Sequence, residues 1–327
     1  MGQAQTRKQK ILGDVKKARR QRIIISTVII TILAVGIVAG VIIFLQPKPQ
    51  DPNIGQPIST QMYDYLSGVS NTTLSQVGIG ASQGVSPMTP FPSGAGSLTL
   101  GGKPEFLYVG ADYCPYCAAE RWSIIVALSK FGTFTGLTYM ESSQTDIYAN
   151  TPTFSFWNPQ TKLPVNYTSP YIAFVSVETS DRNQNTLQKL SSDQQTLINN
   201  YDCYNGQCGG LAYVDIANQW EMGTASHAGS QFLPNILDGV GNWTTIGSLL
   251  NNPTTAPAQA VDGAANYLIS AICSVDGNSP SSVCSHTVTQ APLGVSNAPI
   301  SNSFNIITTG DVRTDDSSWR SFPSLTW

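Results

Sequence analysis

The stretch that decides the fold is FLYVGADYCPYCAAERWSIIVAL, which runs from Phe106 to Leu128. Its first part lies in PEFLYVGAD, residues 104–112, which carries a short apolar run of the kind that forms a buried β-strand. The part that begins with AAERW has the pattern of a helix. Cys114 and Cys117 stand at the junction, so the sequence predicts a strand, then Cys-Pro-Tyr-Cys, then a helix.

This junction suits thiol–disulfide chemistry. A cysteine at a helix N-terminus lies beside unpaired backbone amides and the positive end of the helix dipole, and both stabilise its thiolate. Cys114 is therefore the predicted attacking thiolate, and Cys117, one turn later, is the predicted resolving thiol. Pro115 begins a helix without the loss of a needed N–H group.

Charged and polar neighbours of the two cysteines are candidates for tuning them. Asp112 and Tyr113 come directly before Cys114, and an acid there opposes the thiolate, which raises its pKa and makes the pair more reducing. A buried acid can also transfer a proton. Glu120 and Arg121 begin the helix, where charges are usually solvated, so we expect Glu120 to be exposed. A lone histidine such as His227, which follows the last expected strand, is usually incidental.

The charges of the 327-residue chain are unevenly distributed. Residues 1–22 carry eight of the 17 Lys and Arg residues but one of the 20 Asp and Glu residues. The remainder is therefore strongly acidic, which argues against nucleic-acid binding. Only 11% of all residues are charged, so we expect a polar but weakly charged surface that is rich in loops.

Residues 23–45 form an uncharged apolar run that is long enough to cross a bilayer as a helix. A cleaved signal peptide, the alternative, has a shorter apolar region. Basic residues flank only the N-terminal side, so the positive-inside rule predicts a single-pass protein of the cell membrane with a cytoplasmic N-terminus. The body is then extracytoplasmic. Three Asn-x-Ser/Thr sequons agree with export and are predicted glycosylation sites: Asn71, Asn166 and Asn242.

The chain thus divides into five parts. Residues 1–22 are a basic cytoplasmic tail and residues 23–45 the transmembrane helix. Residues 46–100, rich in proline, glycine and serine, are predicted to be an extracytoplasmic stalk or linker with one short helix. Residues 101–285 form the ordered domain, and residues 286–327 are a polar C-terminal extension.

Periodicity within the ordered domain predicts a mixed α/β fold. Strands are expected at GLTYMES, at TPTFSFW and YIAFVSVE with a turn between them, and on both sides of the Ala-Asn turn in LAYVDIANQWEM. Helices are expected at NTLQKLSSDQQTLINNY, with an interruption near Ser191 and Ser192, at TTIGSLLNN and at APAQAVDGAANYLISAIC.

The six cysteines fall into three local pairs, and an exported protein favours disulfides: Cys114–Cys117, Cys203–Cys208 and Cys273–Cys284. Six cysteines allow fifteen connectivities, so this pairing rests on proximity. The last pair is interpreted as structural, and the second either as a structural clip or as a second redox couple. A zinc site made of the first four cysteines is a further alternative. The oxidising exterior and the uneven spacing count against it, so no metal is predicted.

The same segments resemble known families. FLYVGADYCPYCAAERWSIIVAL resembles the thioredoxin-like superfamily. The body more closely resembles the archaeal membrane-anchored proteins grouped under the uncharacterised domain DUF929. The matching stretches are EFLYVGADYCPYCAAERWSIIVALSKFG, TPTFSFWNP, SPYIAFVSVET, DQQTLINNYD, YVDIANQW and AVDGAANYLISAIC. The resemblance covers residues 100–285. It implies a thioredoxin-like fold, with an inserted segment around residues 150–210, and thiol–disulfide chemistry.

The resemblance also singles out the position that faces the two cysteines. A thioredoxin fold places a cis-proline there, at the start of the next core strand. That strand is AYVDIANQW by threading, and the position is Ala212. Pro152 is the alternative, but the segment before it leaves little room for the helix that should precede that strand. Because a cis bond without proline is costly, we expect a trans peptide at Ala212.

Two function classes follow from these observations. The first is a membrane-anchored thiol–disulfide oxidoreductase with no cofactor beyond its thiols, which acts on exported proteins with cysteines and exchanges electrons with an unidentified partner. The alternative is a non-enzymatic binding or envelope scaffold protein braced by disulfides. The polar flanks, the sequons and the absence of proline at Ala212 favour it. A Cys114 sulfur exposed in a groove would favour the first class, and a buried one would favour the second.

Overall fold

A computed structural model describes residues 50–81, 88–223 and 229–285, and a few single positions between 20 and 36. The chain divides into two compact units, Met1–Asp51 and Pro52–Trp327, and the second is the body described below. Within these described parts, no helix combines the length and the apolar character needed to cross a membrane. The predicted tail, membrane span and C-terminal extension lie almost wholly outside the described residues, so each stays a prediction.

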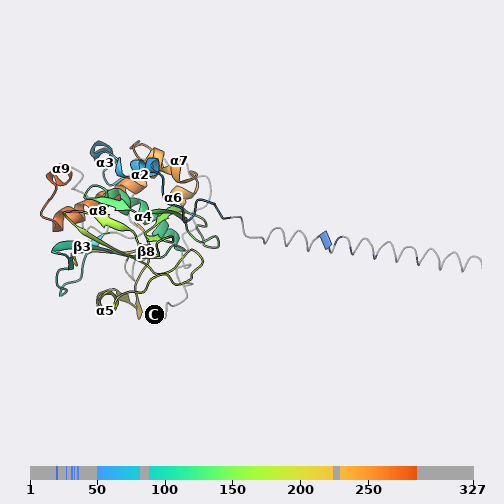
Figure 1. Ribbon diagram of the computed structural model, residues 1–327, viewed down its shortest axis with the longest axis horizontal. Coiled ribbons are helices and arrows are strands. Elements are labelled where there is room, and N and C mark those ends of the chain that lie inside the picture. The colour runs from blue at the N-terminus through green and yellow to red at the C-terminus, as the bar shows by residue number, and fades with distance from the viewer. Residues whose placement is uncertain are drawn as a thin grey trace, which may run out of the picture. The chain divides into compact units, whose positions relative to one another are not determined.

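A mixed sheet forms the centre of the body, which confirms the α/β class (Figure 1). Its strand order is β1–β14–β13–β3–β10, and β2 also pairs with β3. The central strand β3 runs parallel to β10 and antiparallel to β13, and β13 forms a hairpin with β14. The strands are β1 (Thr89–Pro90), β2 (Thr99–Leu100), β3 (Lys103–Gly110), β10 (Ala173–Glu178), β13 (Tyr213–Ile216) and β14 (Trp220–Met222).

Helices cover both faces of this sheet. Figure 1 shows α4 (Pro115–Leu128) and α8 (Ala256–Val275) on one side of β3 and α5 (Ser192–Tyr201) on the other. Side chains alternate along β3 accordingly. Phe106 and Tyr108 join the larger hydrophobic core with α4 and α8, while Leu107 and Val109 join a smaller core with Ile198 of α5. Because both faces of β3 are buried, its residues form an uninterrupted apolar run, and such a run is typical of a buried strand.

Local sequence signals place the ends of the core helices as expected. Pro115 occupies the first turn of α4 with Cys114 as its N-cap, and α8 begins after the N-cap Thr255. The helix expected over NTLQKLSSDQQTLINNY is wrong in its first part, since residues 185–191 are not helical. Helix α5 starts only at Ser192, where the interruption was expected, because Ser191 forms a capping box with Gln194. The hairpin turn between β13 and β14 lies where it was expected, in Ile216–Trp220.

Part of the predicted stalk is instead part of the body. Helices α2 (Thr60–Ser67) and α3 (Asn71–Val77) pack against α4, α7 (Trp243–Leu249) and α8. Their side chains Met62, Leu66 and Leu74 are fully or almost fully buried in the larger core. The prediction of a linker was wrong for these residues. Helices of eight and seven residues show too few turns for a clear apolar stripe, and only their partners in the core reveal their role.

The segment between α4 and β10 holds six short strands outside the central sheet. They pair as β4 with β9, β5 with β6 and β7 with β8. The turn expected between TPTFSFW and YIAFVSVE is therefore wrong, since β6 pairs with β5. Of these strands, β4 and β5 precede the inserted segment predicted around residues 150–210, and β6 to β9 lie within it. The same segment also contains α5 and β10, and β10 belongs to the central sheet. The strands are β4 (Thr133–Thr135), β5 (Thr138–Glu141), β6 (Pro152–Ser155), β7 (Trp157–Asn158), β8 (Leu163–Pro164) and β9 (Asn166–Thr168).

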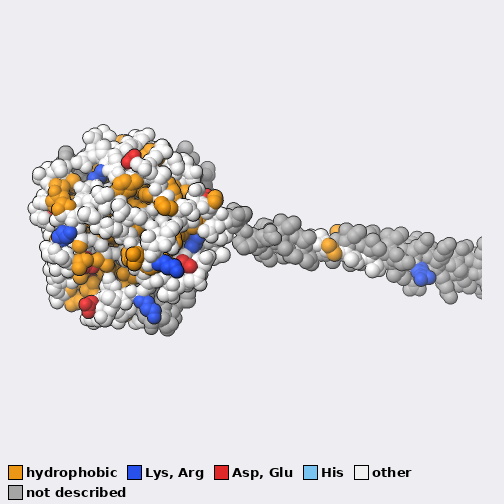
Figure 2. Space-filling model, in the orientation of Figure 1, with side chains coloured by type: hydrophobic (Ala, Val, Ile, Leu, Met, Phe, Trp, Pro, Cys, Tyr) orange, Lys and Arg blue, Asp and Glu red, His pale blue; other side chains and the backbone are white. Residues whose placement is uncertain are grey.

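The remaining elements are short. A two-stranded hairpin of β11 (Cys203–Tyr204) and β12 (Gln207–Cys208) follows α5, and α6 (Asn235–Asp238) and α9 (Ser281–Cys284) flank α7 and α8. The face of the body seen in Figure 2 carries few charged side chains, scattered among neutral polar and apolar ones. This agrees with the low charged fraction of the sequence.

Candidate functional site

The two cysteines lie at the C-terminal end of β3 and the start of α4, as the sequence predicts. Cys114 is the N-cap of α4, and its sulfur accepts a hydrogen bond from the backbone N–H of Cys117 at 3.3 Å. The cap position brings the first thiol to the helix N-terminus, where unpaired amides and the helix dipole favour negative charge.

Both thiols are free, so the disulfide predicted between them is not formed in this structure. Both are also buried, since the exposed fraction is 3% for Cys114 and 0% for Cys117. The other two predicted disulfides, Cys203–Cys208 and Cys273–Cys284, are confirmed. Two of the four cysteines weighed as zinc ligands are therefore bonded to each other and cannot bind the metal as thiolates.

The surroundings of the two thiols shift their pKa values in opposite directions. Burial raises the pKa of Cys114, but hydrogen bonds from Cys117, the positive charge of Arg121 and the amide of Tyr116 outweigh burial and lower the pKa overall. Burial raises the pKa of Cys117 well above its ordinary value, and its hydrogen bond to Cys114 raises it further. The first thiol is thus the readier thiolate and the second the readier proton carrier.

A buried ion network lies near the thiols and was missed from the sequence. Arg121 is fully buried and donates to both carboxylate oxygens of Glu178 on β10, with Nε–Oε1 and Nη2–Oε2 distances of 2.8 and 2.7 Å. Its Nη2 atom also lies 3.5 Å from Asp112 Oδ1. The bidentate geometry offsets part of the desolvation cost of these charges. Because charged residues at the start of a helix are usually solvated, the sequence predicted an exposed Arg121. No pattern of neighbouring residues indicates that Arg121 pairs with Glu178.

Asp112 does not act on Cys114 in the expected way. The carboxyl is almost fully buried, and burial together with the nearby Glu178 raises its pKa to about 8, although Arg121 opposes this. A carboxyl that holds its proton at neutral pH does not repel a thiolate. The pKa of Cys114 is lowered, so the expectation of a raised value was wrong. Tyr113 is half-buried, and burial raises the pKa of its own hydroxyl.

Glu120 is fully buried, which corrects the prediction of an exposed side chain. Its Oε2 atom accepts a hydrogen bond from the backbone N–H of Gln231 at 3.0 Å. Burial raises its pKa to about 8, and the hydrogen bond from Gln231 only partly opposes this. Glu120 therefore joins Asp112 as a second protonatable carboxyl in the core that contains the thiols.

Ala212 lies beside the C-terminal end of β3, the end that leads to the two cysteines. It directly precedes β13, whose first residue Tyr213 pairs with Val109 near the end of β3. It is fully buried and belongs to the same hydrophobic core as both thiols. The Leu211–Ala212 peptide is cis, so the trans expectation was wrong. That expectation rested on the average cost of a cis bond without proline, whereas the packed surroundings of one position decide its isomer.

Pro152, the alternative, lies elsewhere. It begins β6, which pairs with β5 outside the central sheet. Its carbonyl oxygen accepts a hydrogen bond from Trp122 Nε1 at 2.8 Å, which ties β6 to the middle of α4. This position braces the helix that carries the thiols. Ala212, in contrast, directly precedes β13, which pairs with β3 in the central sheet.

The remaining predicted sites are dispersed. Asn166 and Asn242 are exposed, while Asn71 is half-buried and donates through Nδ2 to the Ser282 carbonyl at 3.0 Å. Their glycosylation stays a prediction. His227 lies outside the described residues. Across the described ranges, no three His, Cys, Asp or Glu side chains gather in an arrangement that could hold a metal ion.

A family model described as a domain of unknown function, DUF929, matches residues 94–290. This range contains the two thiols, the central sheet apart from β1, and helices α4, α5 and α8. No curated protein matches the chain. No solved structure matches it either.

Proposed function

Because the chain belongs to the DUF929 family, whose description names no function, we propose one from the site itself: thiol–disulfide exchange by Cys114 and Cys117. The observation that carries this proposal is the N-cap position of Cys114, whose sulfur accepts the Cys117 amide and whose pKa is lowered while that of Cys117 is raised. An attacking thiolate paired with a protonated resolving thiol is the division that exchange requires.

We also propose that the body has a thioredoxin-like arrangement. The support is the strand order β14–β13–β3–β10, with β10 parallel and β13 antiparallel to β3. The two thiols follow β3 at the start of α4, and Ala212 directly precedes β13 beside the same end of β3. These are the relative positions that the resemblance in sequence implies for such a fold.

The proposed reaction has two steps. The Cys114 thiolate attacks one sulfur of a substrate disulfide, forms a mixed disulfide and releases the other substrate sulfur as a thiolate. Cys117 loses its proton and attacks the Cys114 sulfur, which releases the second substrate thiolate and leaves a Cys114–Cys117 disulfide. The substrate gains two electrons, and a partner dithiol restores the free thiols. Arg121, held by Glu178, favours the Cys114 thiolate throughout through its positive charge.

The burial of both thiols favours a second function. Cys114 is only 3% exposed, so a protein disulfide reaches its sulfur only after the covering side chains move. A non-enzymatic scaffold braced by disulfides needs no such motion, and the two disulfides present would serve it. The two functions differ in whether the thiols exchange with external disulfides while the protein stays folded.

We further propose that the body is extracytoplasmic, with residues 23–45 as its membrane anchor. The charge asymmetry of the sequence, the uncharged apolar run and the two disulfides support this location. Exported proteins with cysteines are then the proposed substrates.

A redox titration of the folded protein tests the exchange proposal. In glutathione buffers, with thiols alkylated and assigned by peptide mass, we expect Cys114 and Cys117 to oxidise together at a potential above about −300 mV. Insulin reduction should be lost in the Cys114→Ser variant and kept in a Cys203→Ser/Cys208→Ser variant. A pair inert to glutathione, or an unchanged rate in Cys114→Ser, would support the scaffold function instead.

A further inference from the structure

The two disulfides differ sharply in exposure. Cys203 is exposed and Cys208 is half-buried, whereas Cys273 and Cys284 are 1% and 6% exposed. Access by an external thiol is one of the main factors that set the rate of disulfide exchange. The Cys203–Cys208 bond is therefore open to attack in the folded protein, and the buried Cys273–Cys284 bond serves as an internal reference.

The hairpin that carries Cys203 and Cys208 is also held together by contacts other than the disulfide. The backbone oxygen of Asp202 accepts the N–H of Gly209 at 2.9 Å, and its Oδ2 atom accepts the N–H of Gly210 at 3.2 Å. Asn205 and Gly206 form the turn, with φ of 51° and 80°. Because these bonds close the loop, the two sulfurs stay neighbours after reduction, which favours rapid re-formation of the disulfide.

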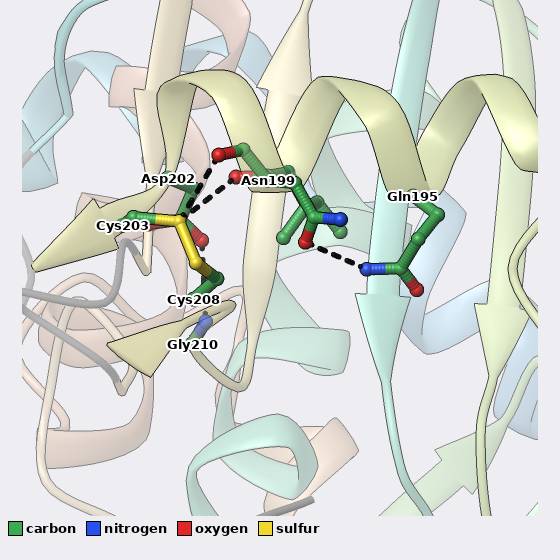
Figure 3. The surroundings of a disulfide bond; sticks show 7 residues. Gln195, Asn199, Asp202, Cys203, Cys208 and Gly210 are labelled. Carbon is green, nitrogen blue, oxygen red and sulfur yellow. Dashed lines mark hydrogen bonds between the residues drawn. A yellow bond between two sulfur atoms is a disulfide. The ribbon is translucent and has the colours of Figure 1, made fainter. Parts of the chain in front are cut away.

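The end of α5 distinguishes the two sulfurs. Figure 3 shows Cys203 beside the last turn of this helix, and its sulfur lies 3.2 Å from the Asn199 carbonyl oxygen. A disulfide sulfur carries no hydrogen, so this approach is a contact and not a hydrogen bond. Carbonyl oxygens at a helix C-terminus disfavour negative charge, so Cys203 is the poorer leaving group as a thiolate. Exposure and charge together direct attack to Cys203, with Cys208 as the leaving thiolate.

We propose that Cys203–Cys208 is a reversible exchange site for an external thiol, separate from Cys114 and Cys117. The external thiolate attacks Cys203 Sγ, the bond between Cys203 and Cys208 breaks, and Cys208 leaves as a thiolate. A second external thiol then attacks the mixed disulfide, so the protein gains two electrons and two thiol molecules become one disulfide. The class of ligand is a small exported thiol or a protein dithiol, and reduced glutathione is the probe.

Peptide mass analysis of the folded full chain tests this site. The protein is treated with reduced glutathione, quenched with N-ethylmaleimide and cleaved before aspartate. Residues 202–214 then form one peptide, and Cys273 and Cys284 fall in two others. We expect the Cys203–Cys208 bond to open at least about tenfold faster than the Cys273–Cys284 bond. Early samples should carry glutathione on Cys203 and maleimide on Cys208. Equal opening rates, or glutathione on Cys208, would overturn the proposal.

Two variants separate this site from the other thiols and from a structural clip. In a Cys114→Ser/Cys117→Ser variant the opening rate should be unchanged, so the exchange is measured independently of the function proposed above. In a Cys203→Ser/Cys208→Ser variant we expect the Tm to fall by less than about 4 °C. A larger fall would mean that the disulfide holds the hairpin and is a structural clip, which would overturn reversible opening in the folded state.

Discussion

Buried ionisable side chains are the main feature at the scale of single residues. Arg121, Glu178 and Glu120 are fully buried, and Asp112 is almost so. The guanidinium neutralises Glu178 through two short hydrogen bonds, while Asp112 and Glu120 have pKa values raised to about 8 by burial. The core around the thiols therefore combines one fixed ion pair with two carboxyl groups that hold protons at neutral pH.

Glu120 makes the stability of the protein depend on pH. Its ordinary pKa is 4.5, so between pH 4.5 and about 8 the folded protein holds a proton that the unfolded chain has released. The free energy of unfolding should therefore fall as pH rises through this window, by at most about 1.4 kcal/mol per pH unit for this one group. Urea denaturation of the wild type and Glu120→Gln at pH 5, 6, 7 and 8 measures the effect.

The difference between the two proteins isolates Glu120, because other buried carboxyl groups such as Asp215 and Glu221 also have raised pKa values. We expect the wild type to lose more stability than Glu120→Gln across the series. Asp193→Asn, which alters an exposed acid in the first turn of α5, is the matched control and should keep the wild-type slope. A Glu120→Gln variant with the full wild-type slope would contradict the prediction.

At the scale of elements, α4 has no solvent face. All 14 of its residues are buried, since α8, α2 and β6 pack around it. An interpretation that assigns one apolar and one solvated face to a helix therefore fails here, and Glu120 and Arg121 were misplaced for this reason. The period of the apolar residues was readable, but the number of neighbours around the helix was not.

The β13–β14 hairpin has a close backbone approach that depends on glycine. Gly223 follows β14 with φ +71°, and a Cβ atom there would lie 1.5 Å from the Ala212 carbonyl oxygen. We expect Gly223→Ala to destabilise the protein severalfold more than Gly94→Ala. Gly94 also has a positive φ, but a Cβ atom there meets nothing within 4 Å, so it costs only about 1–2 kcal/mol. Urea denaturation of both variants provides the test, and equal losses would contradict it.

At the scale of the whole molecule, the residues before the central sheet complete the core. Met62, Leu66, Val69 and Leu74 are at most 1% exposed and pack in the core that contains α4 and α8. Each such side chain contributes about 1.5–3 kcal/mol by burial. Together they match a large part of the 5–15 kcal/mol by which a domain is typically stable.

The ordered domain should therefore not fold from residue 101. We expect a fragment of residues 52–285 to unfold cooperatively in urea, and a fragment of residues 101–285 to show no cooperative transition. Circular dichroism and tryptophan fluorescence along the same titration measure this. A cooperative transition of similar midpoint in the shorter fragment would show that α2 and α3 are dispensable.

The sequence by itself determined the strand, Cys-Pro-Tyr-Cys and helix order, the β13–β14 turn and the two disulfides. Apolar period, caps and cysteine spacing express these features over a few neighbouring residues. Only the tertiary structure decided that Arg121 pairs with Glu178, that Glu120 and both thiols are buried, and that α2 and α3 belong to the body. Arg121 and Glu178 are 57 residues apart in the sequence. Ala212 is still farther in sequence from the end of β3, beside which it lies. Burial and pKa depend on every element packed around a group, and these contacts leave no local pattern in the sequence.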